Sequence, residues 1–138
     1  MIFAPDLAAK ISLGEKTQTR RPTKRDPNSD PPGRMLPCRY AAGRTYAVQL
    51  SRGGMAVDRI RVLSVERVIT HEISREDAIA EGFASPDEFM ARWKALYGPS
   101  WSGDCWRIEF RLEPTSATPT ATAVGSQKGP AAVREGST

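Results

Sequence analysis

The stretch PDLAAKISLGEKTQTRRP, from Pro5 to Pro22, predicts a helix, a turn and a strand in direct succession. Pro5 suits the first position of a helix, apolar residues recur at helical spacing, and Gly14 is the residue type that commonly ends a helix. We therefore expect a short helix from Pro5 to Leu13. The β-branched and long side chains of TQTRR favour a strand, which Pro22 ends or places at a sheet edge.

Three further segments have the residue pattern of β-strands. CWRIEFRLE, residues 105–113, alternates apolar and charged side chains and is the clearest strand in the chain. RTYAVQL (44–50) and AVDRIRVLSVERV (56–68) are joined by SRGGM, whose glycine pair predicts a hairpin with a connection longer than two residues. In the second of these strands Ile60 and Val62 alternate with less apolar neighbours, which predicts one apolar face.

Two segments carry the start and stop signals of capped helices. SREDAIAEG (74–82) begins with serine and ends with glycine, and SPDEFMARWKALYG (85–98) begins with a capping box and ends with glycine. The second helix places Phe89, Trp93 and Leu96 on one stripe. We expect these side chains to belong to the core rather than to a platform for stacking bases.

Two segments have the composition of irregular chain. Residues 23–37, TKRDPNSDPPGRMLP, hold four prolines and several turn formers, which predicts a mobile loop. After residue 113 the composition shifts to Thr, Ala, Pro, Gly and Ser without aromatic residues. We therefore expect one domain over residues 1–113 and a disordered tail over residues 114–138.

The element order is helix, strand, loop, two or three strands, two helices and a strand, which predicts a mixed α+β fold. The sequence has no P-loop, dinucleotide-binding glycine motif, nucleophile elbow or paired-histidine helix. Its two cysteines, Cys38 and Cys105, are expected to be reduced, and with the single His71 they make no metal cage. No cofactor or metal is expected. No apolar run is long enough for a membrane span and no targeting segment is visible, so we expect a cytoplasmic protein.

Positive charge is concentrated near the start of the chain. The whole chain of 138 residues has a formal net charge of +4, whereas Lys10 to Arg44 alone contains nine basic and three acidic residues. This distribution favours a binding face for an acidic partner. RNA fits such a face, DNA is an alternative, and the oligomeric state is not indicated.

Four motifs together resemble the ASCH family, whose members have a PUA-like fold: GEKTQTRRP after a helix, CRYAAGRTYAVQ entering a strand, EDAIAEGF, and the closing CWRIEFRL. The resemblance covers about residues 1–113 and implies a small β-barrel of about five to six strands flanked by helices. It also implies relatives among small amidohydrolases that remove the acetyl group from acetylcytidine. Their catalytic lysine, threonine and glutamate match Lys16, Thr19 and Glu81. Other family members resemble ribonucleases.

The chemistry of these three residues can be argued separately. A threonine hydroxyl becomes a nucleophile when a base removes its proton, and a lysine serves as that base when burial and positive neighbours such as Arg20 or Arg21 lower its pKa. Glu81 could orient the lysine, pass a proton to the leaving amine or bind a cytosine amino group. In one continuous strand Lys16 and Thr19 would point to opposite faces, so their convergence requires a turn or bulge near Lys16.

Three functions remain open at this point. The first is a reader of RNA or modified nucleosides that uses Thr17, Arg20 and Arg21, with Arg39 pairing with phosphate and Tyr40 stacking on a base. The second is a hydrolase or ribonuclease that works without a metal ion. The third is an adaptor that binds another protein. Residues 23–37 could cover the pocket or hold basic residues against a phosphate backbone.

Overall fold

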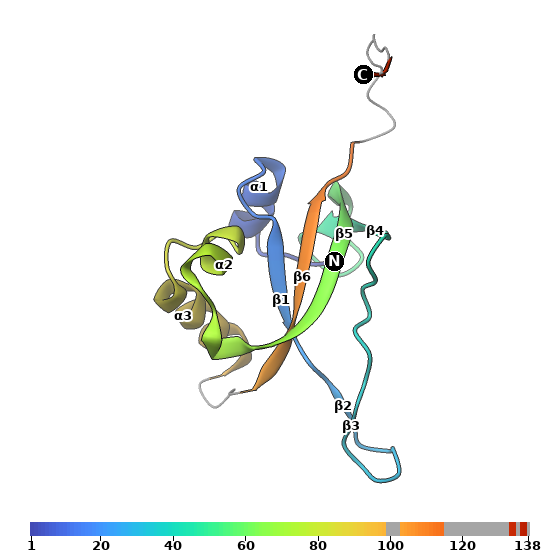
Figure 1. Ribbon diagram of the computed structural model, residues 1–138, viewed down its shortest axis with the longest axis vertical. Helices are drawn as coiled ribbons and strands as arrows, with labels where there is room; N and C mark the ends of the chain where they lie inside the picture. Colours follow the sequence, from blue (N-terminus) through green and yellow to red (C-terminus); the bar gives the residue numbers. More distant parts are fainter. Residues whose placement is uncertain (99–102, 115–132, 135, 138) are drawn as a thin grey trace.

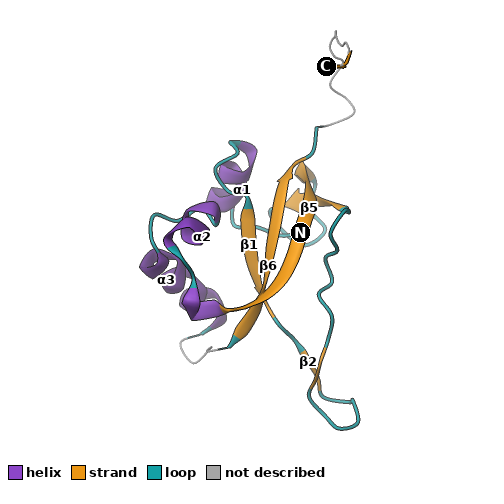
Figure 2. Ribbon diagram, viewed as in Figure 1, coloured by secondary structure: helices purple, strands orange, loops and turns teal. Residues whose placement is uncertain are grey.

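A curled antiparallel sheet with helices on its concave side forms the body of the molecule (Figure 1). The computed structural model describes residues 1–98, 103–114, 133–134 and 136–137. The four strands of the sheet run in the order β1-β6-β5-β4, with β1 at Gln18–Pro22, β4 at Thr45–Gln49, β5 at Ala56–Ile69 and β6 at Asp104–Leu112. The helices are α1 (Pro5–Ser12), α2 (Arg75–Ala80) and α3 (Pro86–Tyr97), with a short 3-10 helix η1 at Thr70–Glu72. Figure 2 shows the separation of helices and strands. The α+β half-barrel agrees with the expected fold class.

The helices begin and end where the sequence predicts. In α1 the apolar residues Leu7, Ala8 and Ile11 are buried, and Leu13 follows as the C-cap. The side chain of Ser74 accepts a hydrogen bond from the backbone of Asp77 and caps α2, as serine does at many helix starts. Ser85 caps α3 in the same way, through the backbone N–H of Glu88, and Gly98 follows the last helical residue.

The long strand β5 changes register partway along its length. Ile60 and Val62 face the core and are fully buried, as their alternation predicts. A register shift between Val62 and Ser64 leaves Leu63 without a partner on β6, and an extra residue of this kind increases local bending and twist. This bulge accounts for part of the curl that carries β5 towards α2 and α3 in Figure 1.

The core consists of two apolar clusters. The first joins α1 to the sheet and includes Phe3, Ile11, Ile60 and Phe110, and the second joins α2 and α3 to the sheet and includes Ile73, Phe89, Trp93 and Cys105. Phe83 packs against both clusters. The candidate site lies where the clusters meet, so its walls are set by the packing of the core.

Residues 23–37 contain a short hairpin that the expectation of a loop did not include. Residues Arg25–Asp26 (β2) and Arg34–Met35 (β3) pair antiparallel, and we call residues 24–36 the arm because they project from the sheet in Figure 1. The oxygen atoms of Asp26 accept hydrogen bonds from Asn28, Ser29 and Gly33. The turn-forming residues thus close a hairpin, whereas their composition alone indicated only irregular chain.

Two further expectations need correction. The main sheet has four strands among the described residues, fewer than the expected five to six, because β2 and β3 pair with each other instead of extending it. Leu96 is 62% exposed, although helical spacing placed it on the buried stripe, because α3 turns this side chain towards the rim of a cavity. Phe89 and Trp93 are buried as expected.

The expectation of a disordered tail falls mostly on residues outside the described part of the chain. Within it, Val133–Arg134 (β7) and Gly136–Ser137 (β8) form a short parallel pair. Both cysteines are free thiols. None of the helices in the described part combines the length and apolar composition that crossing a membrane requires.

Candidate functional site

A turn after α1 brings Lys16 beside the end of α2. Gly14 adopts a φ of +77°, a left-handed conformation that glycine takes without a steric penalty. The chain then passes along α2, and the backbone N–H of Thr17 donates to the carbonyl of Ala80 at 2.8 Å. The strand β1 starts only at Gln18. Lys16 therefore lies in a turn before the strand, as its convergence with Thr19 requires. Its side chain need not follow the alternation of side chains along β1.

The Lys16 ammonium is buried and held by three acceptors. It is 2% exposed and donates to the carbonyl oxygens of Gln18 and Glu81, each at 2.7 Å. A third, longer contact of 3.4 Å reaches Oε1 of the Glu81 carboxylate. The two short bonds go to backbone carbonyl groups. A neutral amine still has two N–H groups, so Lys16 can make both bonds whether it is charged or neutral.

Glu81 lies between two cations. Its carboxylate is 3.4 Å from Lys16 Nζ through Oε1 and 3.9 Å from Arg20 Nε through Oε2. Oε2 is buried and accepts no hydrogen bond from the described residues. Arg20 is itself fixed from behind, because its Nη2 donates to Asp77 at 3.0 Å. Glu81 Oε2 therefore remains available to a donor on a bound molecule.

Burial shifts the pKa values of the pair towards each other. It lowers the pKa of Lys16 below its ordinary 10.5, against the attraction of Glu81, and Arg21 and Lys10 lower it further. Burial also raises the pKa of Glu81 above its ordinary 4.5, although Lys16 and Arg20 lower it. The neutral forms of both groups are thus more accessible than in water, which favours proton transfer within the pair.

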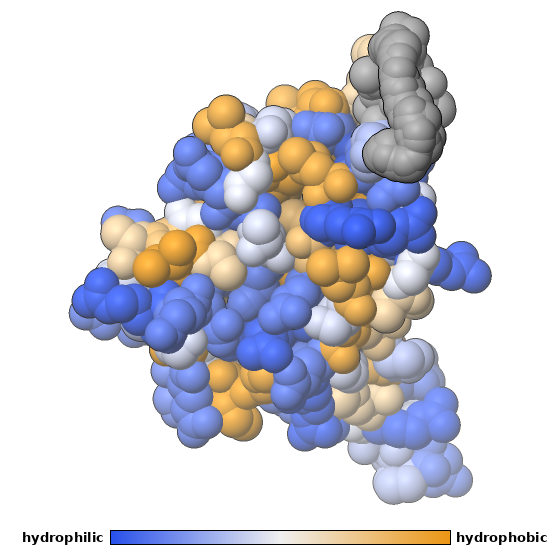
Figure 3. Space-filling model, turned by 45° about the horizontal axis from the view of Figure 1, so that its top comes forward, coloured by the Kyte–Doolittle hydropathy of each residue, from blue (hydrophilic) through white to orange (hydrophobic). Residues whose placement is uncertain are grey.

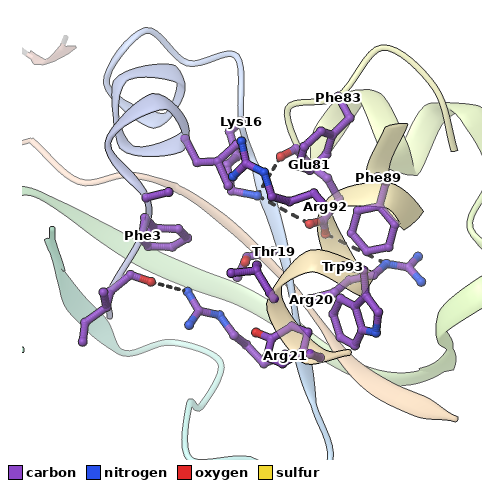
Figure 4. Close-up of a pocket in the computed structure, with 15 residues that line it drawn as sticks. Phe3, Lys16, Thr19, Arg20, Arg21, Glu81, Phe83, Phe89, Arg92 and Trp93 are labelled. Carbon is purple, nitrogen blue, oxygen red and sulfur yellow. Dashed lines mark hydrogen bonds and ion pairs between the residues drawn. The ribbon is translucent and has the colours of Figure 1, made fainter. Parts of the chain in front are cut away.

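A cavity of about 240 Å³ opens beside the pair. Its walls combine polar groups from the turn and β1 with apolar side chains of both core clusters (Figure 4): Phe3, Lys16, Thr19, Arg20, Arg21, Glu81, Phe83, Phe89, Arg92 and Trp93. The volume is below the roughly 300 to 1,000 Å³ of sites for drug-sized ligands. It suits a ligand of about the size of one nucleobase.

The structure brings together most of the residues expected at the site. Lys16, Thr19 and Glu81 line this one cavity, and Arg20 and Arg21 line it with them. The close-up in Figure 4 shows Thr19 below Lys16, with Phe3 to one side of it and Trp93 to the other. The convergence of Lys16 and Thr19 thus comes from the turn before β1.

Three other expected residues lie elsewhere. Thr17 is exposed and lines a separate hollow with Asp77 and Glu109, so it does not join the site. Arg39 and Tyr40 line a groove that adjoins the cavity. Tyr40 is half-buried and stacks edge-on against Tyr46, with ring centroids 5.0 Å apart.

Sequence reasoning missed the apolar walls and the support behind Arg20. Phe3 lies under the cations of Lys16 and Arg21 at 5.9 and 4.9 Å from the ring centroid, yet its position near the chain start carried no signal. Phe89 and Trp93 were expected only as core residues, and they also line the cavity. Asp77 lies in the predicted helix SREDAIAEG, four residues before Glu81 and so on the same helix face, but it was not considered as a site residue.

Comparisons with known proteins agree on the fold. The site and sheet define an α+β half-barrel whose helices enclose a buried lysine–glutamate pair. The sequence matches no family model, and no curated protein is significantly similar to it. Among solved structures, protein EF3133 from Enterococcus faecalis V583, of family DUF984, is 19% identical with a TM-score of 0.52 over 78% of this chain and 67% of that one. The ASCH domain from Lactobacillus crispatus JV V101 is 18% identical with a TM-score of 0.50 over 78% of this chain and 70% of that one. The chain therefore has the ASCH-like fold that its motifs indicate.

Proposed function

We propose that the protein binds a modified nucleoside in the Lys16–Glu81 cavity and hydrolyses an acylamide on its base, as the resemblance to acetylcytidine amidohydrolases implies. The observation that carries this proposal is the shared wall of the cavity. A buried lysine, a buried glutamate with a free oxygen and a threonine line the same nucleobase-sized space. In the described residues no group of three or more His, Cys, Asp or Glu side chains could hold a metal ion, and the steps below use none.

The first half of the reaction acylates the threonine. The neutral Lys16 amine removes the proton of the Thr19 hydroxyl as its oxygen attacks the acyl carbonyl carbon. The negative charge that develops on the carbonyl oxygen is stabilised by the guanidinium groups of Arg20 and Arg21, which line the cavity. The C–N bond then breaks, and the proton held by Lys16 passes to the leaving amino nitrogen, directly or through Glu81.

The second half releases the acid. Lys16, neutral again, removes a proton from a water molecule, whose oxygen attacks the ester carbonyl on Thr19. The ester C–O bond breaks and the proton returns from Lys16 to the Thr19 oxygen. Both halves use one base with a lowered pKa, the direction that burial produces for Lys16.

Recognition of the base follows from the same groups. Glu81 Oε2 can accept a hydrogen bond from an exocyclic N–H, which is how carboxylates contact cytosine. The rings of Phe3, Phe89 and Trp93 supply apolar surface for the flat faces of the base. These groups require a ligand with a hydrogen-bond donor on the edge of a flat ring. An N-acylated cytosine meets this requirement better than a sugar or a peptide does.

A turnover assay tests this function. We expect cytidine release from acetylcytidine, with Lys16→Met lowering kcat/KM by about 10² to 10⁴-fold and Thr19→Ala removing turnover. Thr19→Ser should retain part of it because a hydroxyl remains. Lys94→Met, an exposed lysine on α3, is the matched control and should match the unmodified protein. Full turnover by Thr19→Ala would eliminate the covalent route.

A reader without catalysis is the second candidate, and one observation favours it. All three hydrogen bonds of the Lys16 ammonium go to protein oxygen atoms, so in its charged form the lysine is a fixed support for the pocket. In that case the protein binds the nucleoside and releases it unchanged. Calorimetry with acetylcytidine then gives binding, Glu81→Gln weakens it, and no cytidine appears. An RNA substrate in the same assay tests the ribonuclease alternative.

A further inference from the structure

A second hollow of about 430 Å³ adjoins the candidate active site. Arg21 and Tyr97 line both spaces, so the two share a boundary. Beyond that boundary the hollow runs between the end of β1, the base of the arm and β6. We call it the arm groove, and the residues used in the argument are Arg21, Lys24, Arg39, Tyr40, Tyr97 and Trp106.

The cations of the arm groove have no carboxylate partners. Arg21, Lys24 and Arg39 form no ion pair with any described residue, and no acidic residue lines the groove. Elsewhere most arginines of the sheet and helices are paired: Arg20 with Asp77, Arg61 with Glu113, Arg67 with Asp104, Arg92 with Asp6 and Arg107 with Glu66. Three cations without carboxylate partners thus line one hollow that has no acidic residue in its wall, which favours an anionic ligand.

The groove also presents aromatic rings. Tyr40 is held by Tyr46, whose hydroxyl accepts a hydrogen bond from the backbone of Ala41 at 2.8 Å. Tyr97 is 38% exposed and Trp106 is half-buried on β6. Rings beside unpaired cations are the combination that binds single-stranded nucleic acid, since the cations contact phosphate and the rings stack on bases.

The arm fixes one wall of the groove. The backbone N–H of Leu36 donates to the carbonyl of Lys24 at 2.9 Å, which holds the two ends of the hairpin together at the groove. Thr23 is anchored to β6 through a hydrogen bond of 2.8 Å to Asp104. The space-filling view shows the projecting arm as a mainly hydrophilic surface (Figure 3). The hairpin therefore holds Lys24 and Leu36 at the groove, and Arg39 follows three residues after its end.

We propose that the arm groove binds the phosphate and the neighbouring base of a nucleotide chain whose modified base occupies the Lys16–Glu81 cavity. The proposal rests on the proposed function for the identity of that base. Arg21 stands at the boundary between the two spaces, anchored by its bond of 2.8 Å to the carbonyl of Ile2, where the phosphate next to the bound nucleoside would lie. A phosphorylated nucleotide or a single strand is then preferred over a free nucleoside, which occupies the cavity alone.

Binding measurements on the full chain test the groove without requiring turnover. The probes are cytidine, its 5′- and 3′-monophosphates and a mixed-sequence RNA trinucleotide, titrated by calorimetry at two salt concentrations. We expect a monophosphate to bind about tenfold more tightly than cytidine and the trinucleotide to bind more tightly still. A gain from the monophosphate alone would identify free nucleotides as the source of the phosphate.

Two variants test which residues cause the tighter binding of the phosphorylated probes. Lys24→Ala combined with Arg39→Ala should remove most of the advantage of the phosphorylated probes, lower the salt dependence of their binding by about one phosphate contact per residue and leave cytidine binding unchanged. Arg52→Ala, an exposed arginine in the turn between β4 and β5, is the control and should change none of these values.

Two results would overturn the groove as a phosphate site. One is equal affinity for cytidine, the monophosphates and the trinucleotide, and the other is tighter binding of the phosphorylated probes that persists in the double variant. Failure of the two proposals is distinguishable. Trinucleotide binding that depends on Arg39 in a protein with no hydrolase activity supports the groove and rejects the proposed chemistry. Turnover of acetylcytidine without any gain from phosphate does the reverse.

Discussion

Lys16 and Glu81 are two charged residue types placed in the core, each about 2% exposed. Burying a charge is costly unless opposite charges and hydrogen bonds compensate for the loss of water. The compensation here comes from two backbone carbonyls, the mutual attraction of the pair and the nearby Arg20. Each residue of the pair therefore controls the charge state of the other.

Replacing Lys16 by methionine should reveal this coupling in the pH dependence of the free energy of unfolding. The cation lowers the pKa of Glu81 in the folded protein, so its removal raises that pKa further. Between 4.5, the ordinary value, and the raised folded value, the folded state then holds a proton that the unfolded chain has lost. The free energy of unfolding of Lys16→Met should fall as pH rises, by up to about 1.4 kcal/mol per pH unit.

Urea denaturation between pH 5 and pH 8 measures this slope. The double variant with Glu81→Gln is the matched control, since it lacks the titrating group and should lose the added dependence. A Lys16→Met profile parallel to that of the unmodified protein would contradict the coupling.

At the scale of elements, the end of α2 positions the Lys16–Glu81 pair. Gly82 follows Glu81 with a φ of +98°, and a Cβ built there would lie 3.3 Å from Lys10 Cδ and 3.7 Å from Lys16 Cβ. Its carbonyl also accepts a hydrogen bond from Lys10 Nζ. This glycine thus lets α2 end while α1, the turn and Glu81 remain in contact.

We expect Gly82→Ala to lower the free energy of unfolding by about 1 to 2 kcal/mol, the cost of a side chain in the left-handed region, and to lower activity or nucleoside affinity as Glu81 shifts. Gly53→Ala is the matched control, because Gly53 also has a positive φ of +74° but no atom within 4 Å of the added Cβ. Gly53→Ala should lower the free energy of unfolding without changing activity or nucleoside affinity. Denaturation curves and the turnover assay, run on both variants, separate these effects, and an unchanged site in Gly82→Ala would show that Glu81 is held by other contacts.

At the scale of the whole molecule, the arm is attached to the sheet without forming part of it. Strands β2 and β3 pair only with each other, and no residue of either apolar cluster comes from 24–36. A hydrogen bond joins Lys24 and Leu36, the two ends of the arm. A Gly-Gly link in place of residues 25–35 can therefore connect them.

Excision of residues 25–35 in this way should leave the cooperative unfolding transition in place, within about 1 kcal/mol of the full chain. It should also leave the binding of phosphorylated probes in place, because Lys24, Leu36 and Arg39, which line the arm groove, are all retained. Circular dichroism on heating and calorimetry check the two parts. Loss of folding would show that the arm supports the sheet.

The elements themselves were largely predictable. The helix from Pro5, the strand ended by Pro22, the hairpin through SRGGM, both serine caps and the closing strand all follow from residue patterns spanning a few positions, since capping and alternation are local properties. The hairpin of the arm was not predicted because side-chain hydrogen bonds of Asp26 and Ser29 close it, and composition does not reveal such bonds.

For the site, the sequence by itself determined the candidate residues Lys16, Thr19 and Glu81 and the concentration of positive charge near the start of the chain. Only the tertiary structure decided that these residues share one cavity, that Thr17 lies outside it and that Arg39 and Tyr40 line a separate groove. The reason is physical: Glu81 lies 65 positions from Lys16, and burial by two core clusters that meet between α1 and α3, rather than any local preference, brings them together and shifts their pKa values.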